Sequence, residues 1–599
     1  MSKVEYKILD LFSGCGGFAV GFDMLPEFET LIAVDIMDDA LKTFARNFPK
    51  AKIINGDICD EAVKRDIIQS AKELKINMIV GGPPCQGFSN KGKKLGLKDP
   101  RNFLFREYLK LVDEIKPDVF VIENVKALVA TENGWFINEI LNEIKKLGYT
   151  VNYNIATASN YGVPQQRQRT IILASKDAKI DFPIPKYDEE KKTTVRDAIS
   201  DLAYLESGEG EIESNYKNTA QSKYQELLRN PSGKLYNHNA TNHSEVALSK
   251  LKMIPPEGDK KSLPKELLGN QKFNTTWGRL KWDSQSPTID TRFDTPSNGT
   301  NSHPELDRSI TPREAARIQS FPDSFKFLGS KTYICKQIGN AVPPLLAKAI
   351  GEAVLFGEKK QDYLIYNRDA YRFLRDMASY GFEVDHIITD PPYNISKDNN
   401  FSTMKSAKRQ GVDFGEWDKE FDLTGWIPDA EKILRPGGTF IIFNSYRNLT
   451  PIIEKMESCG LVIKDVIKWI KTNPMPRNID RRYVQDTEYA IWAVKPKKPW
   501  VFNKKADKPY LRAEYRTSTV SGNERTSHPT QKSEKLMSEI IEVHSNKGDL
   551  ILDPFMGSGT TGVSALSKGR RFIGCELSEE YFDIAKERIS NKWKTPMMF

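Results

Sequence analysis

Two glycine-rich turns, one near each end of the chain, constrain its fold most strongly. The first is Asp10–Phe18 (DLFSGCGGF) and the second is Asp553–Thr561 (DPFMGSGTT), and each follows a short apolar run. After each turn come an amphipathic stretch and a second apolar run that ends in an acid, Asp35 or Glu576. This is the βαβ layout of nucleoside-binding folds, in which glycines admit the ligand and the later acid accepts ribose hydroxyls. A single such loop can be a plain tight turn, but two with matching acids predict two α/β domains.

Length and composition narrow the protein class. The 599 residues correspond to about three to five domains at roughly 100–200 residues each. Hydrophobic residues make up 39% and charged residues 28%, which is typical of soluble globular proteins. No apolar run is long enough for a membrane span, and no signal-peptide pattern follows Met1. We therefore expect a cytoplasmic protein.

The cysteines and the net charge bear on ligands and partners. Six cysteines are scattered from Cys15 to Cys575, and none forms a Cys-x-x-Cys pair. A disulfide framework or a structural zinc site is therefore not expected, and no metal is predicted. The net charge of +8 is compatible with a polyanionic partner without requiring one.

A cysteine in a stiff loop follows another predicted strand of the first half. The strand Asn77–Val80 leads into Gly-Gly-Pro-Pro-Cys-Gln, in which Pro83 and Pro84 hold the backbone beside Cys85. Such a loop lies at the carboxyl edge of a parallel sheet, where these folds bind ligands. Cys85 is therefore a candidate nucleophile, and the alternative is a buried structural cysteine.

Charged residues follow later strands of the first half. Glu123 comes at the end of the predicted strand Asp118–Ile122, so its carboxyl group is expected at the same sheet edge. Arg167 and Arg169 are two residues apart and share one face if their segment is extended, which suits an anionic group. A solvated basic edge strand is the alternative for this pair.

In this order, the segments resemble the DNA cytosine-5 methyltransferase family over nearly all of residues 6–356. The matching segments are Asp10–Phe18, Pro83–Gln86, Glu123–Val125, Gln165–Arg169, Arg308–Phe325 and Gly339–Pro344. The resemblance implies that Cys85 attacks carbon 6 of a flipped-out cytosine in double-stranded DNA. It implies that Glu123 protonates or hydrogen-bonds ring N3 and that Arg167 and Arg169 position the base. The implied methyl donor is S-adenosylmethionine.

The same resemblance implies the cofactor contacts of the first half. Phe18 is expected to pack against the adenine, Asp35 to bind the ribose and Asp57 to bind the adenine amine. Family members usually carry Glu where Asp35 stands. The other expected cofactor-binding residues are Phe12, Gly14, Gly16 and Asn340.

The second half carries a different catalytic motif and reverses the order of the parts. The predicted strand Asp385–Thr389 ends in DPPY, and the glycine-rich turn follows much later. An Asp fixed beside prolines and an aromatic ring suits an exocyclic amine, because Asp390 and the Pro391 carbonyl can accept its N–H groups while Tyr393 stacks on the base. Taken alone, the same four residues are more typical of a simple turn. The predicted catalytic set is Asp390, Pro391, Pro392 and Tyr393.

Residues 363–599 resemble the β-class of DNA amino-methyltransferases, in which the catalytic motif precedes the cofactor motif. Supporting segments are Trp469–Pro476, Glu488–Trp492, Ser527–Lys532 and Asp553–Thr561. Asp at position 390 favours adenine-N6 methylation, and cytosine-N4 methylation is the alternative, since those members more often carry Ser there. The resemblance implies a second S-adenosylmethionine site formed by Asp369, Asp390, Phe555, Gly557, Gly559 and Glu576, with His528 and Lys532 nearby. A helix N-cap is the alternative role for Asp369.

The predicted architecture is α/β, with two Rossmann-like methyltransferase domains, the second circularly permuted in motif order, and a small irregular target recognition domain. The cytosine-5 domain covers 1–185 and 286–356, the target recognition domain 186–285, a linker 357–362 and the amino-methyltransferase domain 363–599. Residues 186–285 are polar, and a disordered insert is the alternative, but their tyrosines and tryptophans favour a folded domain. Target readers of the second half are expected in 394–417 or 477–525.

The fusion itself suggests a biological role. A non-palindromic site presents different bases on its two strands, so one cytosine and one adenine methyltransferase together cover both. We expect a bacterial or phage enzyme that protects an asymmetric site from a cognate restriction endonuclease. The alternatives are a tRNA cytosine-5 methyltransferase, a non-enzymatic DNA-binding regulator and a modification enzyme without a restriction partner.

Overall fold

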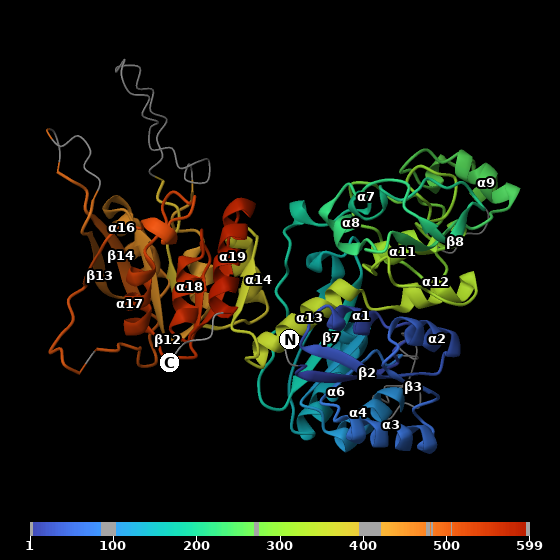
Figure 1. Cartoon of the computed structure of the whole chain (residues 1–599), viewed down its shortest axis with the longest axis horizontal. Helices are drawn as coiled ribbons and strands as arrows, with labels where there is room; N and C mark the ends of the chain where they lie inside the picture. The colour runs from blue at the N-terminus through green and yellow to red at the C-terminus, as the bar shows by residue number, and fades with distance from the viewer. Residues whose placement is uncertain are drawn as a thin grey trace, which may run out of the picture. The chain divides into compact units, whose positions relative to one another are not determined.

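The computed structural model of the chain describes residues 4–84, 103–268, 275–394, 421–474, 480, 483–504 and 506–594. The chain divides into two compact units (Figure 1). Unit 1 consists of Met1–Pro183 and Glu189–Glu358, and unit 2 consists of Ile184–Asp188 and Lys359–Phe599. Within the described residues, no helix is long and apolar enough to cross a membrane.

Unit 1 is built on a seven-stranded sheet, as far as its described residues go. The strands are β1 (Tyr6–Leu11), β2 (Phe28–Asp35), β3 (Lys52–Asn55), β4 (Met78–Gly81), β5 (Val119–Val125), β6 (Thr150–Thr157) and β7 (Gln168–Ser175). Their order is β3-β2-β1-β4-β5-β7-β6, and all neighbours are parallel except β7, which is antiparallel to β5 and β6. The carboxyl ends of β1, β2, β4 and β5 therefore meet at one edge.

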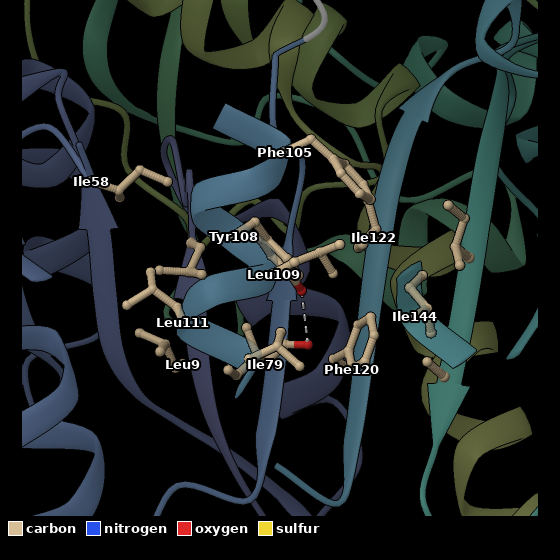
Figure 2. Close-up of a cluster of buried hydrophobic side chains, with 14 of the residues drawn as sticks. Leu9, Ile58, Ile79, Phe105, Tyr108, Leu109, Leu111, Phe120, Ile122 and Ile144 are labelled. Atoms are coloured by element: carbon tan, nitrogen blue, oxygen red, sulfur yellow. Dashed lines mark hydrogen bonds between the residues drawn. The ribbon is translucent and has the colours of Figure 1, made fainter. Parts of the chain in front are cut away.

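Two apolar clusters join strands of this sheet to helices of unit 1. The helices are α1 (Gly17–Asp23), α2 (Asp38–Asn47), α3 (Glu61–Leu74), α4 (Phe103–Ile115), α5 (Ala127–Ala130), α6 (Trp135–Lys146), α11 (Pro312–Ile318), α12 (Lys331–Asn340) and α13 (Pro344–Gly357). Leu9 and Leu11, which point to one face of β1, pack in the cluster with α3, α4 and α6 (Figure 2). Ala33 of β2 packs in the other cluster, with α1 and α2.

A buried tyrosine shows how a polar group is accommodated in the larger cluster. Tyr108 of α4 lies between Ile79 of β4 and Phe120 of β5 (Figure 2). Its hydroxyl donates to the carbonyl of Val121 at 3.1 Å and to that of Ile79 at 3.5 Å. The phenol thus contributes apolar area without leaving a buried hydroxyl unpaired.

The region between β7 and α11 is folded but irregular. Its elements are α7 (Val195–Ile199), β8 (Gly210–Asn215), α8 (Lys223–Leu228), β9 (Lys234–Asn239), α9 (Glu245–Lys252) and α10 (Lys265–Leu268), and β8 pairs antiparallel with β9. Tyr224 and Trp282 are buried in one cluster with Phe321 and Phe325, and Trp277 is buried in another. Buried aromatic residues of the described part of 186–285 thus pack in apolar clusters, one of which it shares with residues that follow it in the chain.

Unit 2 is built on an eight-stranded sheet, counted over its described residues. The strands are β10 (Tyr363–Tyr366), β11 (Val384–Thr389), β12 (Leu434–Asn444), β13 (Val462–Lys471), β14 (Thr487–Val494), β15 (Glu514–Thr517), β16 (Leu550–Asp553) and β17 (Arg571–Cys575). Their order is β10-β17-β16-β11-β12-β14-β13-β15. Only β14 runs antiparallel to its neighbours β12 and β13.

The two sheets share one layout with different starting points. The first seven strands of the unit 2 order, β10-β17-β16-β11-β12-β14-β13, correspond one by one to β3-β2-β1-β4-β5-β7-β6 of unit 1. Thus β16 and β17 correspond to β1 and β2, and β11 and β12 correspond to β4 and β5. In unit 1 the two cofactor-side strands come first in the chain, whereas in unit 2 they come last. The predicted circular permutation is therefore confirmed at the level of strand order.

Helices cover unit 2 in two groups. One consists of α14 (Ala370–Ser379), α15 (Ile427–Ile433) and α16 (Leu449–Ser458), which contact one another in sequence. The other consists of α17 (Glu534–His544), α18 (Thr560–Ser567) and α19 (Glu579–Lys594). Residues of the second group pack with Ile388, Ile441 and Ile551 of the sheet in one apolar cluster.

Candidate active sites

The glycine-rich turn of unit 1 is tied to the acid at the end of the next strand. Gly14 has a φ of +53°, a conformation that favours glycine. Its N–H donates to Asp35 Oδ2 at 2.8 Å, while Met37 N–H donates to Asp35 Oδ1 at 2.8 Å. Burial raises the pKa of Asp35, and these backbone hydrogen bonds oppose the rise. Hydrogen bonds therefore hold the turn and the predicted ribose-binding acid together.

The same arrangement recurs in unit 2. Gly557, with a φ of +51°, donates its N–H to Glu576 Oε2 at 3.0 Å, and Ser578 N–H donates to Glu576 Oε1 at 2.8 Å. A Cβ at Gly557 would lie 2.8 Å from His528 Nε2. Each sheet therefore carries an acid that bridges the glycine turn and the residue two positions after the acid.

Two further glycines of unit 1, both in α1, lie against the backbone of the Gly339–Pro344 motif. A Cβ at Gly17 would lie 2.3 Å from the carbonyl oxygen of Val342, and one at Gly21 would lie 2.2 Å from that of Pro344. Helix α1 thus packs directly on the 339–344 segment. This contact brings the last motif of the first half to the cofactor turn.

The remaining predicted cofactor residues of unit 1 differ in exposure. Phe12, which has a φ of +58°, is half-buried at the end of β1, whereas Phe18 is buried in α1 with its ring stacked on Phe22. Asp57 is exposed and accepts the N–H of Cys59 at 2.9 Å. Asn340 is exposed. Gly16, with a φ of +102°, precedes α1.

Unit 2 contains a cavity of about 420 Å³ at the carboxyl edge of its sheet. Its volume lies in the range of small-molecule and cofactor sites. Predicted site residues that line it are Asp369, Asp390, Pro391, Pro392, Tyr393, His528, Lys532, Phe555, Gly557 and Glu576. The cavity therefore brings together the predicted cofactor and catalytic residues of this half, except Gly559, which precedes α18.

Asp390 lies in a buried charge network within this cavity. Lys532 Nζ is 2.5 Å from Asp390 Oδ2 and 3.1 Å from Glu488 Oε2. Tyr393 Oη donates to Asp390 Oδ1 at 2.6 Å. Glu488 also pairs with Lys471 at 2.6 Å. Lys532, predicted near the cofactor, thus reaches the catalytic carboxylate directly.

The network sets the charge of each member. Burial raises the pKa of Asp390, and Lys532 holds it down. Burial would also raise the pKa of Glu488, but Lys532 and Lys471 lower it to about 2. Burial lowers the pKa of Lys532, and the two carboxylates outweigh that effect and raise it. Lys532 is therefore a buried cation beside two carboxylates.

Other predicted residues of this cavity have packing roles as well. Asp369 is the N-cap of α14, accepting the N–H of Arg372 at 3.0 Å, and it also lies in the cavity wall; its contact with a cofactor stays a prediction. The Phe555 ring makes edge contacts with Phe421 and Trp426. Burial lowers the pKa of His528 to about 4.

The catalytic edge of unit 1 is described only in part, because Cys85 lies outside the described residues. The loop before it is anchored, since Asn124 Nδ2 donates to the carbonyl of Pro83 at 3.0 Å. Glu123 is mostly buried, with 12% of its side chain exposed, and pairs with Arg169, with 2.8 Å between Oε1 and Nε. Burial raises the pKa of Glu123, and both Arg169 and Arg167 oppose that rise. The sequence predicted a strand that ends before Glu123, but β5 continues to Val125, so Glu123 lies within the strand.

Arg167 faces a different partner from Arg169. Its Nη1 donates to the carbonyl of Gly339 at 3.0 Å and its Nη2 to that of Asn340 at 3.5 Å. It is only 2% exposed, and burial with the nearby Arg169 lowers its pKa to about 9. In this structure Arg167 therefore fixes the 339–344 segment beside Glu123.

Four of the described cysteines have surroundings unlike those of a nucleophile. Burial raises the pKa of the thiols of Cys15, Cys59, Cys335 and Cys575. Within the described ranges, no group of three or more His, Cys, Asp or Glu side chains could hold a metal ion.

Sequence reasoning missed three residues that the structure places at these sites. Glu488 joins the Lys532 network although only its segment was expected to matter. Asn124 of β5 and Asn444 of β12 each accept the N–H of the following residue with their own side chain, at equivalent strand ends. An asparagine at the end of an apolar run was the available signal for both.

Comparisons with known proteins agree with this geometry. Residues 6–355 match the family model described as C-5 cytosine-specific DNA methylase, and residues 384–587 match an N6/N4 family model described as DNA methylase. The type II methyltransferase M1.HphI of Haemophilus parahaemolyticus is 35% identical over 350 residues, covering 58% of this chain and 86% of that protein. The type II methyltransferase M.DdeI of Desulfomicrobium norvegicum is 32% identical over 431 residues, covering 67% of this chain and all of that protein.

Among solved structures, the M1.HpyAVI–SAM complex is 45% identical, covers 38% of this chain and 98% of that one, and has a TM-score of 0.33. Both family matches fall on segments whose motifs and sheet order agree with them. The chain therefore belongs to the C-5 cytosine-specific DNA methylase family through residues 6–355 and carries a second DNA methylase domain, of the N6/N4 type, in its C-terminal half.

Proposed function

We propose that this bifunctional DNA methyltransferase transfers methyl groups from S-adenosylmethionine to carbon 5 of cytosine and to N6 of adenine. The observation that carries the proposal is the repeated pairing of a glycine turn with an acid, Gly14 with Asp35 and Gly557 with Glu576, beside two different catalytic motifs. The chain thus has two proposed cofactor sites, each beside a different catalytic motif.

The residues present fit S-adenosylmethionine. Both turns use glycines with positive φ, which leave the backbone open to a ligand, and both acids present carboxylate oxygens to ribose hydroxyls. In unit 2 the cavity of about 420 Å³ adds Phe555, Asp369 and Ser578. In unit 1 the expected aromatic contacts of the cofactor are Phe18, which packs against the adenine, and the half-buried Phe12. The bound cofactor supplies an electrophilic methyl group at each site.

In unit 1 the chain's own groups prepare the cytosine ring. Cys85, in the loop anchored through Pro83 and Asn124, is the nucleophile toward carbon 6. Glu123 in its neutral form donates a hydrogen bond to ring N3, which a carboxyl with a raised pKa can do. Arg169 Nε, 2.8 Å from Glu123 Oε1, orients that carboxyl as a hydrogen-bond donor, and Arg167 holds the segment that follows Gly339.

In unit 2 the chain activates an exocyclic amine without a covalent intermediate. Asp390 in its ionised form and the carbonyl of Pro391 accept the two N–H bonds of the target amine, which leaves the nitrogen lone pair free. The Tyr393 ring stacks on the flipped base. Asp390 then accepts the proton that the methylated nitrogen loses. Lys532 keeps Asp390 in the form that can do so.

Adenine N6 is the preferred target because an aspartate occupies position 390, and cytosine N4 is the second candidate. Mass spectrometry of nucleosides from the modified DNA distinguishes N6-methyladenine from N4-methylcytosine directly. Detection of N4-methylcytosine in place of N6-methyladenine would reverse this assignment while leaving the two-site mechanism intact.

The similarity to type II methyltransferases supports a role beside a restriction endonuclease, with the two marks on opposite strands of one asymmetric site. The test is base-resolved methylation sequencing of DNA from a methylation-free host that expresses the chain. Cys85→Ala should remove only 5-methylcytosine and Asp390→Ala only the amino-methyl mark. Two unrelated motifs would argue against the asymmetric site, and methylation confined to tRNA would argue against DNA as the substrate of unit 1.

A further inference from the structure

A short segment of the chain that lies between the two parts of unit 1 in the sequence belongs to unit 2. Ile184–Asp188 is assigned to unit 2, whereas residues on both sides of it belong to unit 1. Ile184 is 2% exposed and Asp188 is 5% exposed. The segment reads Ile-Pro-Lys-Tyr-Asp, and its proline limits the backbone to extended conformations. It thus carries a carboxylate into the interior of unit 2.

Asp188 contacts two consecutive residues of unit 2 with its two oxygens. Arg368 Nε and Nη2 lie 3.0 and 2.8 Å from Asp188 Oδ1. Asp188 Oδ2 accepts the backbone N–H of Asp369 at 2.8 Å. Arg368, itself 3% exposed, also donates to the carbonyl of Pro185 at 2.9 Å. These are charge-assisted contacts in a buried setting, where each has a large effect on position.

The two residues held by Asp188 belong to the cofactor cavity. Arg368 and Asp369 both line it, in the turn between β10 and α14. The same turn is tied to the end of β17, because Cys575 Sγ donates to the carbonyl of Arg368 at 3.2 Å and Asn367 Nδ2 donates to that of Glu576 at 2.8 Å. The turn therefore lies between Asp188 on one side and the predicted ribose-binding acid on the other.

We propose that Asp188 is a positioning residue for the cofactor site of unit 2, and that the second activity depends on a segment encoded within the first half of the chain. The proposal rests on the function proposed above for that cavity. Asp188 itself does not line the cavity. It acts by fixing the N–H of Asp369, and with it the side chain that faces the cofactor.

A matched control separates this role from simple packing of Arg368. Asp376 pairs with Arg368 Nη2 at 2.8 Å but makes no hydrogen bond to Asp369. Asp376→Ala therefore removes one carboxylate from the same guanidinium and leaves the anchor of Asp369 in place. Asp188→Ala removes both the ion pair and the anchor.

The experiment uses the full chain with unmethylated plasmid DNA and varied S-adenosylmethionine, and it quantifies both marks by mass spectrometry. We expect Asp188→Ala to raise the KM for S-adenosylmethionine in the amino-methylation reaction about tenfold, the size of a lost hydrogen bond to a charged group. The kcat of that reaction and both constants for 5-methylcytosine should stay within about twofold. Asp376→Ala should leave the KM within about twofold.

Equal increases in KM for both variants, or an unchanged KM in Asp188→Ala, would overturn the proposal. So would an equal decrease of 5-methylcytosine and the amino-methyl mark in Asp188→Ala, because the effect would then not be specific to the cofactor site of unit 2. A calorimetric titration in an Asp35→Ala background reports S-adenosylmethionine binding to unit 2 alone. This titration keeps the test independent of the proposed function. Absence of any amino-methyl mark with the unmodified chain would refute the proposed function. Weaker S-adenosylmethionine binding in Asp188→Ala would still support the positioning role of Asp188.

Discussion

Lys532 Nζ lies 2.5 Å from Asp390 Oδ2, although the two residues are 142 positions apart in the chain. Lys532 is 6% exposed, and its ammonium group also faces the rings of Tyr393 and Phe443. The lysine is therefore a fixed, desolvated cation beside the proposed catalytic carboxylate. Its charge opposes the rise that burial causes in the pKa of Asp390.

Lys532→Met should move the acidic limit of amino-methylation to higher pH. Asp390 acts as an acceptor when ionised, so activity is lost as the pH falls through its pKa. Burial raises that pKa and the nearby Lys532 ammonium opposes the rise, so removing the cation lets the pKa of Asp390 rise further. The pH dependence of kcat for the amino-methyl mark measures the shift.

The control for this prediction is Lys471→Met. Lys471 pairs with Glu488 at 2.6 Å and has no ion pair with Asp390, so its removal should shift the limit less. The pH profile for 5-methylcytosine should not move in either variant. Superimposable amino-methylation profiles for Lys532→Met and the unmodified chain would contradict the role assigned to Lys532.

Arg169→Met should move the alkaline limit of cytosine methylation to higher pH. Glu123 donates to the base when neutral, so this activity is lost as the pH rises through its pKa. Burial raises the pKa of Glu123 and Arg169 opposes the rise, so without the guanidinium the neutral form persists to higher pH. The rate falls as well, because Arg169 orients the carboxyl group. Arg169→Lys keeps a cation and should leave the limit near its original position, which a pH series of 5-methylcytosine formation can establish.

Arg317→Met should destabilise unit 1 strongly. Arg317 of α11 is fully buried between Asp323, at 2.7 Å, and Asp201. Removing the cation takes the Arg317 guanidinium away from two buried carboxylates. Breaking a buried ion pair by removing one partner costs about 3–5 kcal/mol of folding free energy. The temperature at which cytosine methylation is lost should fall by many degrees. Arg196→Met breaks the exposed pair with Asp283 and should leave that temperature unchanged, since solvent already screens it.

The cofactor turns could be predicted because their signals are local. A short apolar run, glycines at positions that adopt positive φ and an acid after the next run determine the contacts between Gly14 and Asp35 and between Gly557 and Glu576. The permuted motif order of the second half was predicted from the same runs, and the structure adds the strand order of each sheet. These features need no knowledge of which distant residues meet.

The contacts that join distant segments were not predictable in this way. Lys532 was expected near the cofactor, and only the folded chain shows that it pairs with Asp390. Asp188 lies in a stretch without hydrophobic periodicity, 180 positions before Arg368, so neither its burial nor its partner follows from spacing. The boundaries at 185–186 and 285–286 remain predictions for the same reason, because irregular segments carry no period from which to place an end.

Tyr393→Phe should separate the two roles of the tyrosine. The hydroxyl donates to Asp390 Oδ1 at 2.6 Å, whereas the ring is expected to stack on the flipped base. Phe keeps the ring and removes one hydrogen bond to the carboxylate, so kcat for amino-methylation should fall about tenfold with little change in the KM for DNA. Tyr393→Ala also removes stacking worth about 1–3 kcal/mol per base, so the KM for DNA should rise as well. Steady-state kinetics of the two variants test this division, and equal KM values for Phe and Ala would show that the ring does not contact the base.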